Sequence, residues 1–184
     1  MRKLAGRDFK RILLIKPSSP GDIVHALPVL HALRHRYPEA HISWLVASPF
    51  VDLIAADPAL DEVISFDRRR FGRLGRNLAV SLDFLRFTRE LFARRFDLVV
   101  DLQGLFRSGF LSLACGAKTR VGFSDARELG WLFYSHRLRC PTRDAHAADR
   151  NAQFGRLLDF DTQAMDFTLT LTTDDRRVAY DLIS

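Results

Sequence analysis

The sequence contains little cysteine and little lysine, and it lacks any long run of apolar residues. Two cysteines among 184 residues, Cys115 and Cys140, are too few for a disulfide framework or a cysteine-rich zinc site, which favours a reducing compartment. The apolar run Ile12–Ile15 stops at Lys16. It is far shorter than the roughly 20 residues of a membrane-spanning helix and too brief for a secretory signal. We therefore expect a cytoplasmic chain that can touch a membrane face.

The remaining composition is that of an ordinary globular protein. Apolar residues make up 47% and charged residues 27% of the chain, which excludes collagen-like, mucin-like, disordered and coiled-coil proteins. A chain of 184 residues can bury a core without staples, and it fits one domain or one domain with part of a second.

The basic residues are almost all arginine. Four lysines and 24 arginines against 22 acidic residues give a formal net charge of +6. This charge indicates an anionic partner, such as nucleic acid, a membrane surface or a phosphorylated small molecule, because arginine grips phosphate and carboxylate with a planar fork. For most single arginines, a GC-rich genome that encodes Arg in place of Lys is the favoured explanation. No helix-turn-helix, zinc-finger or RNP motif accompanies the charge, so nucleic acid is not expected as the partner.

Short β-like runs alternate with amphipathic helical stretches along the chain. This rhythm is typical of βαβ units and predicts an α/β fold, a Rossmann-like, doubly wound, mostly parallel sheet. The expected strands are Arg11–Lys16, His41–Val46, Glu62–Phe66, Leu98–Asp101 and Arg120–Phe123, and the expected helices are Ile23–Arg36, Leu78–Arg95, a short one around Ser108–Ala114, and Ala145–Leu158. The spacing in the second helix predicts a core-facing stripe of Leu82, Leu85, Leu91 and Phe92.

The end of the chain indicates a domain boundary. Thr172 and the acidic residues after it look like a helix start, and the chain ends at Ser184 without a helix stop signal. We expect residues 1–172 to form one domain and residues 173–184 to begin a connecting helix, with a second domain absent from this chain.

The loop after the first expected strand is the strongest candidate site. Ligands of open α/β sheets bind beyond the carboxyl ends of strands, and Ser18, Ser19 and Gly21 lie there before a helix, where free N–H groups suit an anion. The glycine pattern of dinucleotide-binding proteins and the Gly-Lys-Ser/Thr of ATPases are both absent, so neither class is expected. A tight turn with Asp22 as its N-cap is the plain structural alternative.

Asp22 also suits a chemical role. A carboxylate at a strand-to-helix junction is held rigidly where substrate binds, and it can take a proton from an attacking hydroxyl group. The helix N-terminus is expected to lower its pKa and keep it ionised near neutral pH. His25, close to the same loop, is a candidate substrate contact. The histidines lack the spacing and the glutamate of a zincin motif, so no metal is expected.

Two further segments are candidates for substrate binding. After the strand Leu98–Asp101, Gln103 and Ser108 can hydrogen-bond a sugar hydroxyl, and Gly104 lets the backbone approach closely; a plain strand-to-helix turn explains them equally well. The basic run over residues 67–76 can bind phosphate or carboxylate groups, or it can be an exposed, mobile loop. Its candidate residues are Arg68, Arg69, Arg70 and Arg73.

These segments together resemble glycosyltransferase family 9, the ADP-heptose:lipopolysaccharide heptosyltransferases. The stretch Ile15–Pro28, which reads IKPSSPGDIVHALP, is similar to the opening of that family, and Asp101–Ser108 matches a second hallmark. Weaker similarities lie at Ser124–Glu128, at Leu132–Tyr134 and at His146 with Arg150. The resemblance runs from about residue 11 to about residue 158.

The resemblance implies a GT-B fold of two Rossmann-like domains, of which this chain is the N-terminal, acceptor-binding half. It implies that Asp22 is the general base of an inverting, metal-independent transfer that needs no cofactor. The residues implied to shape the acceptor loop or bind the acceptor are Ser18, Ser19, Gly21, His25, Arg68, Arg69, Arg70, Arg73, Gln103, Gly104 and Arg127. The donor ADP-heptose would bind the missing C-terminal domain.

The sequence thus predicts the acceptor domain of a heptosyltransferase, inactive in transfer on its own. Its expected partners are the lipopolysaccharide inner-core acceptor, ADP-heptose through the missing domain, and the anionic inner membrane, which a basic surface would hold. Two alternatives stay open: a family 9 transferase with another sugar or acceptor, and a noncatalytic module that binds an anionic ligand or nucleic acid.

Overall fold

The computed structural model describes residues 4, 6–73, 75–139, 146–161 and 166–183. Within them, one sheet holds β1 (Arg11–Ile15), β2 (His41–Ala47), β3 (Glu62–Phe66), β4 (Leu98–Asp101), β5 (Thr119–Phe123) and β6 (His136–Leu138). The helices are α1 (Pro20–Val24), α2 (Leu27–Arg36), α3 (Arg68–Phe71), α4 (Leu78–Ala93), α5 (Phe106–Ala114), α6 (Ala147–Leu158) and α7 (Thr173–Ile183), with 3₁₀ turns η1 (Ser48–Phe50) and η2 (Gly130–Phe133). The five expected strands are present within one residue of their predicted bounds, and β6 is an addition.

The sheet is parallel throughout, with the strand order β3-β2-β1-β4-β5-β6. This is the doubly wound Rossmann order, and it confirms the predicted fold class. The first three strands lie in the order β1, β2, β3 toward one edge of the sheet. The next strand, β4, pairs with the other side of β1. The carboxyl ends of β1 and β4 therefore meet at the switch point of the sheet, where open α/β sheets bind ligands.

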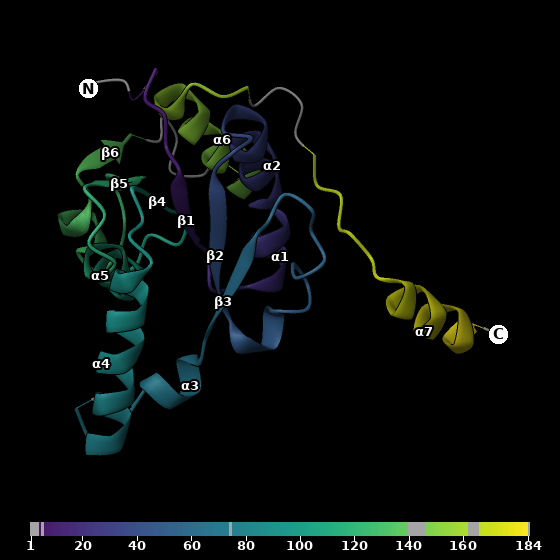
Figure 1. Ribbon diagram of the computed structural model, residues 1–184, viewed down its shortest axis with the longest axis horizontal. Helices are drawn as coiled ribbons and strands as arrows, with labels where there is room; N and C mark the ends of the chain where they lie inside the picture. Colours follow the sequence, from purple (N-terminus) through teal and green to yellow (C-terminus); the bar gives the residue numbers. More distant parts are fainter. Residues whose placement is uncertain (1–3, 5, 74, 140–145, 162–165, 184) are drawn as a thin grey trace.

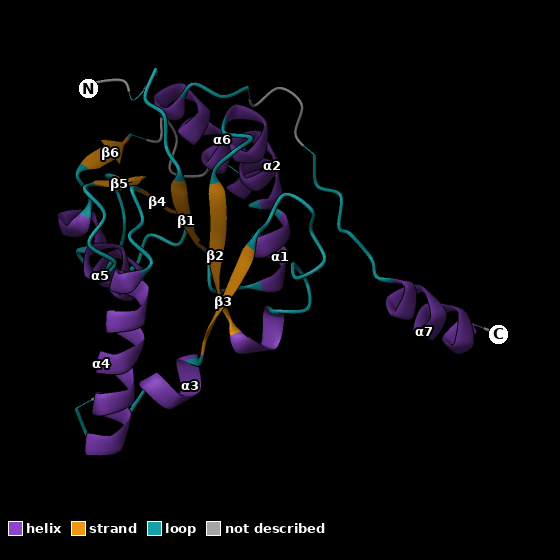
Figure 2. Cartoon of the chain, viewed as in Figure 1, coloured by secondary structure: helices purple, strands orange, loops and turns teal. Residues whose placement is uncertain are grey.

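Helices cover both faces of the sheet (Figure 2). On one face, Ile12 and Leu14 of β1 pack with apolar residues of α1, α2 and α6, and on the other face Leu13 and Ile15 pack with residues of α4 and α5. All four side chains are fully buried, as expected for alternating residues of a strand covered on both sides. The loops that leave the carboxyl ends of β1 and β4 therefore start from fixed positions.

The prediction of one helix over Ile23–Arg36 is wrong, because α1 and α2 are separated at His25 and Ala26. Pro28 occupies the first turn of α2, where its missing N–H costs no helical hydrogen bond. In one continuous helix the same proline would remove a bond from the interior. The break leaves α1 as a separate turn at the edge of the sheet.

The buried face of α4 also differs from the prediction. Leu91 is fully buried as expected, but the other three predicted core residues are largely exposed: Leu82 (48%), Leu85 (54%) and Phe92 (61%). The residues that pack on the core with Leu91 are Phe84 and Phe87. The helix has two apolar stripes, and spacing alone does not distinguish the buried one.

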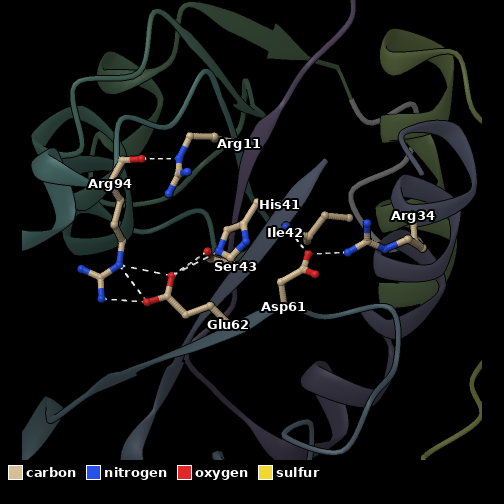
Figure 3. Close-up of polar contacts among 8 residues, drawn as sticks. All are labelled: Arg11, Arg34, His41, Ile42, Ser43, Asp61, Glu62 and Arg94. Atoms are coloured by element: carbon tan, nitrogen blue, oxygen red, sulfur yellow. Dashed lines mark hydrogen bonds and ion pairs between the residues drawn. The ribbon is translucent and has the colours of Figure 1, made fainter. Parts of the chain in front are cut away.

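A polar network ties the amino-terminal edge of the sheet to the flanking helices (Figure 3). Glu62, the first residue of β3, accepts hydrogen bonds from Arg94 Nε at 3.0 Å and Nη2 at 2.8 Å. Asp61 accepts one from the Ile42 N–H at 2.7 Å and pairs with Arg34 of α2. These contacts fix α2 and the end of α4 at the edge opposite the switch point.

His31 of α2 holds together three parts of the chain. Its Nε2 lies 2.9 Å from Asp57 Oδ2, and its Nδ1 lies 3.2 Å from the carbonyl oxygen of Asp166. The hydrogen bond to Asp57 is the largest influence on the pKa of His31 and raises it above its ordinary value of 6.5, against the opposing effect of partial burial. In its protonated form the ring donates from both nitrogens, and it joins α2 to the β2–β3 connection and to the segment before α7.

We expect this contact to make stability depend on pH. The stabilisation from charged His31 is fully present below pH 6.5 and is lost as the pH rises through the raised pKa of the folded state. The free energy of unfolding, measured in urea from pH 5.5 to 8.5, is expected to fall by about 1 kcal/mol more in the wild type than in His31→Gln. His35→Gln, an exposed change on the same helix, is the control and is expected to keep the wild-type slope. Equal slopes for His31→Gln and the wild type would contradict the assignment.

Helix α7 starts where the sequence predicts a helix start. Thr172 Oγ1 accepts a hydrogen bond from the Asp175 N–H at 3.1 Å, and Asp175 Oδ2 accepts one from the Thr172 N–H at 2.8 Å, which is a capping box. The extended residues 166–172 carry α7 away from the α/β body (Figure 1). The domain boundary after residue 172 stays a prediction. Along the parts of the chain that are described, no helix is both long and apolar enough to cross a bilayer.

Candidate functional site

Two cavities open beside the carboxyl ends of β1 and β4. The larger has a volume of about 490 Å³ and is lined by Lys16, Asp22, Leu102, Gln103, Gly104, Phe123, Asp125, Ala126, Arg127, Ala147, Arg150 and Asn151. The smaller, about 140 Å³, is lined by Pro17, Ser18, Phe66, Arg68, Gln103, Leu105, Arg107, Ser108, Leu111 and Glu128. Gln103 borders both cavities, so the turn after β4 separates them at the switch point of the sheet.

Asp22 lies at the larger cavity, in the first turn of α1. Ser19 is the N-cap of that helix, so the alternative that made Asp22 the N-cap is wrong. Asp22 stands three residues later, where its Oδ2 accepts a hydrogen bond from the Ser19 N–H at 3.1 Å. Ser19 and Lys16, the described residues that contact this carboxylate, both reach Oδ2 and leave Oδ1 available to a ligand.

Lys16, at the end of β1, is a site residue that the sequence reasoning did not select. The residue is 8% exposed, and its Nζ lies 3.6 Å from Asp22 Oδ2 and 3.4 Å from the Leu102 carbonyl oxygen. Burial lowers the pKa of Lys16, although the charges of Asp22 and Asp101 oppose the shift. Lys16 could have been selected from the sequence by its position, because it is one of four lysines in the chain and directly follows a buried strand.

The surroundings of Asp22 keep its side chain ionised. Partial burial on its own would raise the pKa of Asp22, but the hydrogen bond from the Ser19 N–H and the charge of Lys16 outweigh burial and lower it. The side chain is 40% exposed, so solvent moderates this effect. At neutral pH the cavity is therefore bordered by a carboxylate in a fixed position.

The turn after β4 is built on a buried carboxyl group. Asp101 is fully buried; its Oδ1 accepts hydrogen bonds from the N–H groups of Gln103 at 2.9 Å and Gly104 at 3.2 Å, and its Oδ2 accepts one from the Tyr134 hydroxyl at 2.7 Å. Burial raises the pKa of Asp101, and these hydrogen bonds oppose the rise. Gly104 has a φ of +68°, which favours glycine. Asp101 thus holds the turn that places Gln103 between the cavities.

The side chains of this turn differ in what they leave for a ligand. The buried Oε1 of Gln103 has no hydrogen-bond partner in the described part of the chain, and the residue lines both cavities. A buried acceptor of this kind is costly unless a ligand or water satisfies it. Ser108 forms local hydrogen bonds, as expected for a plain strand-to-helix turn. Its hydroxyl donates to the Leu105 carbonyl oxygen at 2.9 Å and accepts from the Leu105 N–H at 3.1 Å.

Of the four candidate arginines in the basic run, one reaches a cavity. Arg68 lines the smaller cavity, with its Nη1 3.5 Å from Ser18 Oγ. Arg70 pairs instead with Asp83 of α4. The other two, Arg69 and Arg73, are exposed and line neither cavity. The structure therefore brings Arg68 and Ser18 to the site and leaves the rest of the run outside it.

Guanidinium groups from the β5 loop and α6 border the far side of the larger cavity. Arg127 lines the cavity, and its N–H donates to the Gly104 carbonyl oxygen at 2.9 Å, which joins the two loops. Arg150 of α6 forms a two-pronged ion pair with Asp125, at 2.9 and 2.6 Å, and lies 4.1 Å from the centre of the Phe123 ring. Arg150 and Asp125 belong to segments of weak resemblance, and the sequence reasoning did not select them.

The remaining predicted residues flank the cavities. Gly21 is exposed in α1, and Ser19 caps that helix. The His25 ring centre lies 4.7 Å from that of His146, and the His25 carbonyl oxygen accepts a hydrogen bond from Asn151 Nδ2 at 3.0 Å, so His25 joins the α1–α2 junction to α6. The residues that the structure describes include no group of three His, Cys, Asp or Glu side chains placed to hold a metal ion.

A cavity of about 640 Å³ lies at the opposite, amino-terminal edge of the sheet and is lined by Phe96, Asp97 and Cys115 among others. Asp97 accepts hydrogen bonds from the backbone N–H groups of Lys10 and Arg11, at 2.9 and 3.1 Å, so its role is structural. Burial raises the pKa of the Cys115 thiol to about 11, which makes it a poor nucleophile. The switch point is the better candidate because it combines a cavity with an ionised, positioned carboxylate.

Known proteins resemble this chain in sequence. The family model for glycosyltransferase family 9 (heptosyltransferase) matches residues 84–184, more than half of the chain. Lipopolysaccharide heptosyltransferase 1 of Salmonella typhimurium is 32% identical over 155 residues, which cover 82% of this chain and 49% of that protein. The enzyme of the same name from Pseudomonas aeruginosa is 36% identical over 158 residues, covering 82% and 43%. The chain thus spans about half the length of these curated relatives.

Solved structures share the fold as well. The E. coli heptosyltransferase WaaC with ADP-2-deoxy-2-fluoro heptose matches with a TM-score of 0.76 and 27% identity, over 86% of this chain and 52% of WaaC. A family 9 glycosyl transferase from Veillonella parvula, 23% identical, also has a TM-score of 0.76 and shows the common fold alone. The predicted α/β half of a GT-B glycosyltransferase is confirmed. By its family model, its relatives and its fold, the chain belongs to glycosyltransferase family 9, the heptosyltransferases.

Proposed function

We propose that this chain is the acceptor-binding half of an enzyme that transfers heptose from ADP-heptose to the inner core of lipopolysaccharide. The relatives are named as lipopolysaccharide heptosyltransferases, and the WaaC structure holds an analogue of ADP-heptose. The observation that carries the proposal is Asp22, an ionised carboxylate held by Ser19 and Lys16 at a cavity bordered by cations.

In the proposed reaction, Asp22 takes the proton of an acceptor hydroxyl group while the hydroxyl oxygen attacks the anomeric carbon of heptose. The bond between that carbon and ADP breaks, and ADP leaves with the bonding electrons. Attack on the face opposite ADP inverts the configuration, and Asp22 then returns its proton to solvent. A carboxylate that is ionised at neutral pH fits this role. The proposed transfer uses no metal ion and no cofactor.

The acceptor is proposed to lie across both cavities. Its acidic sugars and phosphates suit the guanidinium groups of Arg68 and Arg127, and the unpartnered oxygen of Gln103 suits a sugar hydroxyl. Ser18 and Gly104 belong to the two loops beneath it. Ser19, Gly21 and His25 are proposed to support this surface from its flank, and the exposed Arg69, Arg70 and Arg73 to attract the anionic acceptor from solution.

We also propose the division into domains that the sequence predicts. Residues 1–172 would form the acceptor domain, and α7 would begin the connection to a donor-binding domain that holds ADP-heptose. The chain alone would then bind acceptor without transferring heptose. Its place of action would be the cytoplasmic side of the inner membrane, in peripheral contact with anionic lipid, where a lipid-linked acceptor lies.

A transfer assay tests the proposal. The polypeptide that joins this chain to its donor domain, given ADP-heptose and a heptose-free inner-core lipopolysaccharide, should release ADP and yield an acceptor heavier by one heptose in a mass spectrum. The chain alone should bind that acceptor and form no product. Transfer of a different sugar would favour the alternative of a family 9 transferase with another sugar. Tight binding to DNA, with none to the acceptor, would contradict the proposal in favour of a noncatalytic module.

Arg68 and Arg69 form a matched pair for testing acceptor recognition. Arg68→Ala is expected to weaken acceptor binding by a factor of roughly 10 to 100, because the loss of a hydrogen bond between charged groups costs about 1.5–3 kcal/mol. Arg69→Ala removes the same charge from the next residue, outside the cavity, and should weaken binding less than threefold. Titration calorimetry with the heptose-free acceptor measures both. Equal losses would show that only overall charge matters and would contradict a placed role for Arg68.

A further inference from the structure

Helix α4 carries an apolar stripe on the side turned away from the core. The stripe consists of Leu78 (77% exposed), Leu82 (48%), Leu85 (54%) and Phe92 (61%). Their spacing of four, three and seven residues places them on one side of the helix. The side that packs on the sheet is a different one, formed by Phe84, Phe87 and Leu91. The stripe is therefore a surface feature that folding of this domain leaves uncovered.

Aligned exposed leucines differ from the single apolar residues found on every protein surface. Contiguous apolar patches are rare on soluble domains and mark contacts with proteins, ligands or membranes. Arg89 falls within the stripe by helical position, and Arg86 lies at its border. A helix that combines an apolar stripe with arginines has the character of helices that lie in the plane of a membrane interface.

The charge of the whole chain is concentrated around this helix. Residues 67–95 contain nine arginines and three acidic residues, a formal net charge of +6, whereas the rest of the chain holds 19 basic and 19 acidic residues. Asp83, one of the three acids, is paired with Arg70 and Arg86. Two of the nine arginines follow α4 at the opposite edge of the sheet, where Arg94 pairs with Glu62 and Arg95 lines the cavity beside Asp97. The other seven lie within residues 67–89, so the surface of α3 and the first part of α4 is cationic and complements an anionic partner.

The position of α3 and α4 relates this surface to the candidate site. In Figure 1, α3 and the first half of α4 extend past the carboxyl ends of the strands, at the edge of the sheet where both cavities open. Arg68, the first residue of α3, lines the smaller cavity. A flat partner that contacts the stripe would therefore lie beside the mouth of the site.

We propose that the α4 stripe and the arginines of residues 67–89 form a docking surface for an anionic lipid bilayer. The stripe enters the interface between head groups and acyl chains, and the arginines contact the phosphates of the anionic lipids. This inference rests on the proposed function for its choice of partner, because a lipid-linked acceptor is presented at a membrane. Pairing of two copies through this face is disfavoured, since it would bring two cationic surfaces together.

Vesicle flotation of the chain tests the proposal without any transfer assay. Vesicles of phosphatidylethanolamine with 30 mol% phosphatidylglycerol should bind the wild type, and phosphatidylcholine vesicles should bind it at least tenfold more weakly. The double variant Leu82→Gln with Leu85→Gln is expected to lower the partition coefficient at least tenfold. The double variant Arg76→Gln with Arg89→Gln, which changes charge alone, is expected to lower it at least tenfold at low salt and much less in 0.5 M NaCl.

The matched control is Leu113→Gln with Leu171→Gln, which removes two exposed leucines from other parts of the surface. It should bind vesicles like the wild type, and circular dichroism should show equal folding of all variants. Unchanged partitioning of the α4 variants would overturn the proposal. So would sedimentation that shows a wild-type dimer abolished by Leu82→Gln with Leu85→Gln, in the absence of vesicle binding. Vesicle binding by a chain whose donor-linked form transfers no heptose would contradict the proposed function and leave this surface standing.

Discussion

Replacement of Asp22 with Asn is expected to lower heptose transfer by a factor of 10² to 10⁴ while acceptor binding stays within about threefold of the wild type. The amide oxygen of Asn can still accept the hydrogen bond from the Ser19 N–H, so the turn that carries residue 22 is retained. The amide has no basic oxygen, and the proton of the acceptor hydroxyl then has no acceptor at this position. Initial rates of ADP release, measured with the donor-linked polypeptide, report the loss.

Two controls separate this role from a general effect of charge. Asp52→Asn removes an exposed carboxylate away from the cavities and should leave the rate unchanged. Lys16→Met removes a charge that lowers the pKa of Asp22, so the acid side of the pH–rate profile should move to higher pH. A wild-type rate in Asp22→Asn would refute the base assignment. A loss of acceptor binding as large as the loss of rate would show that Asp22 binds and does not react.

Replacement of Asp101 with Ala is expected to destabilise the fold by about 3–5 kcal/mol, a large share of the 5–15 kcal/mol of a typical domain. The change leaves the N–H groups of Gln103 and Gly104 and the hydroxyl of Tyr134 without their acceptor at a fully buried place. The turn that presents Gln103 to both cavities would loosen at the same time, so acceptor binding should weaken as well. Urea unfolding and acceptor titration measure the two effects.

The conservative variants define what the Asp101 carboxyl group contributes. Asp101→Asn keeps an acceptor oxygen and should cost less than about 1.5 kcal/mol, whereas Tyr134→Phe removes one of the three donors and should cost about 1 kcal/mol. Burial raises the pKa of Asp101, so the folded state holds the proton more tightly than the unfolded state does. The wild type should therefore lose stability as the pH rises above about 3.8, and Asp101→Asn should lack that loss. An alanine variant as stable as the wild type would contradict the assigned hydrogen bonds.

The central strands could be predicted because their sequences suit burial on two faces. RILLI in β1 and LVVD in β4 are short apolar runs of branched residues, and loop residues follow each of them. β6 consists of His136, Arg137 and Leu138, and its pairing with β5 decides its structure, because nothing in three mostly polar residues indicates a strand. The structure has two helices where one was expected because of Pro28. The fold around Pro28 sets its position in the first turn of α2.

The site was predictable where it follows a strand and was missed where it depends on contacts distant in sequence. Asp22 and Gln103 lie in the segments that follow β1 and β4, so the rule for open α/β sheets selects them. Arg150 lies on α6, and its place beside the larger cavity depends on the ion pair with Asp125 of the β5 loop, 25 residues earlier. No local pattern contains such a pairing. The buried side of α4 could not be predicted for the same reason. Both of its apolar stripes have helical spacing, so the spacing does not show which one packs on the core.

The uneven distribution of charge gives the molecule an electric dipole moment. The positive charge of residues 67–89 is attracted to an anionic surface before contact, so encounters are expected to begin with α3 and the first half of α4 facing that surface. The association rate should therefore fall steeply as added salt shortens the Debye length from about 30 Å at 0.01 M to about 8 Å at 0.15 M. Orientation during approach is then expected to depend on the amino-acid sequence over residues 67–89, independent of any pocket.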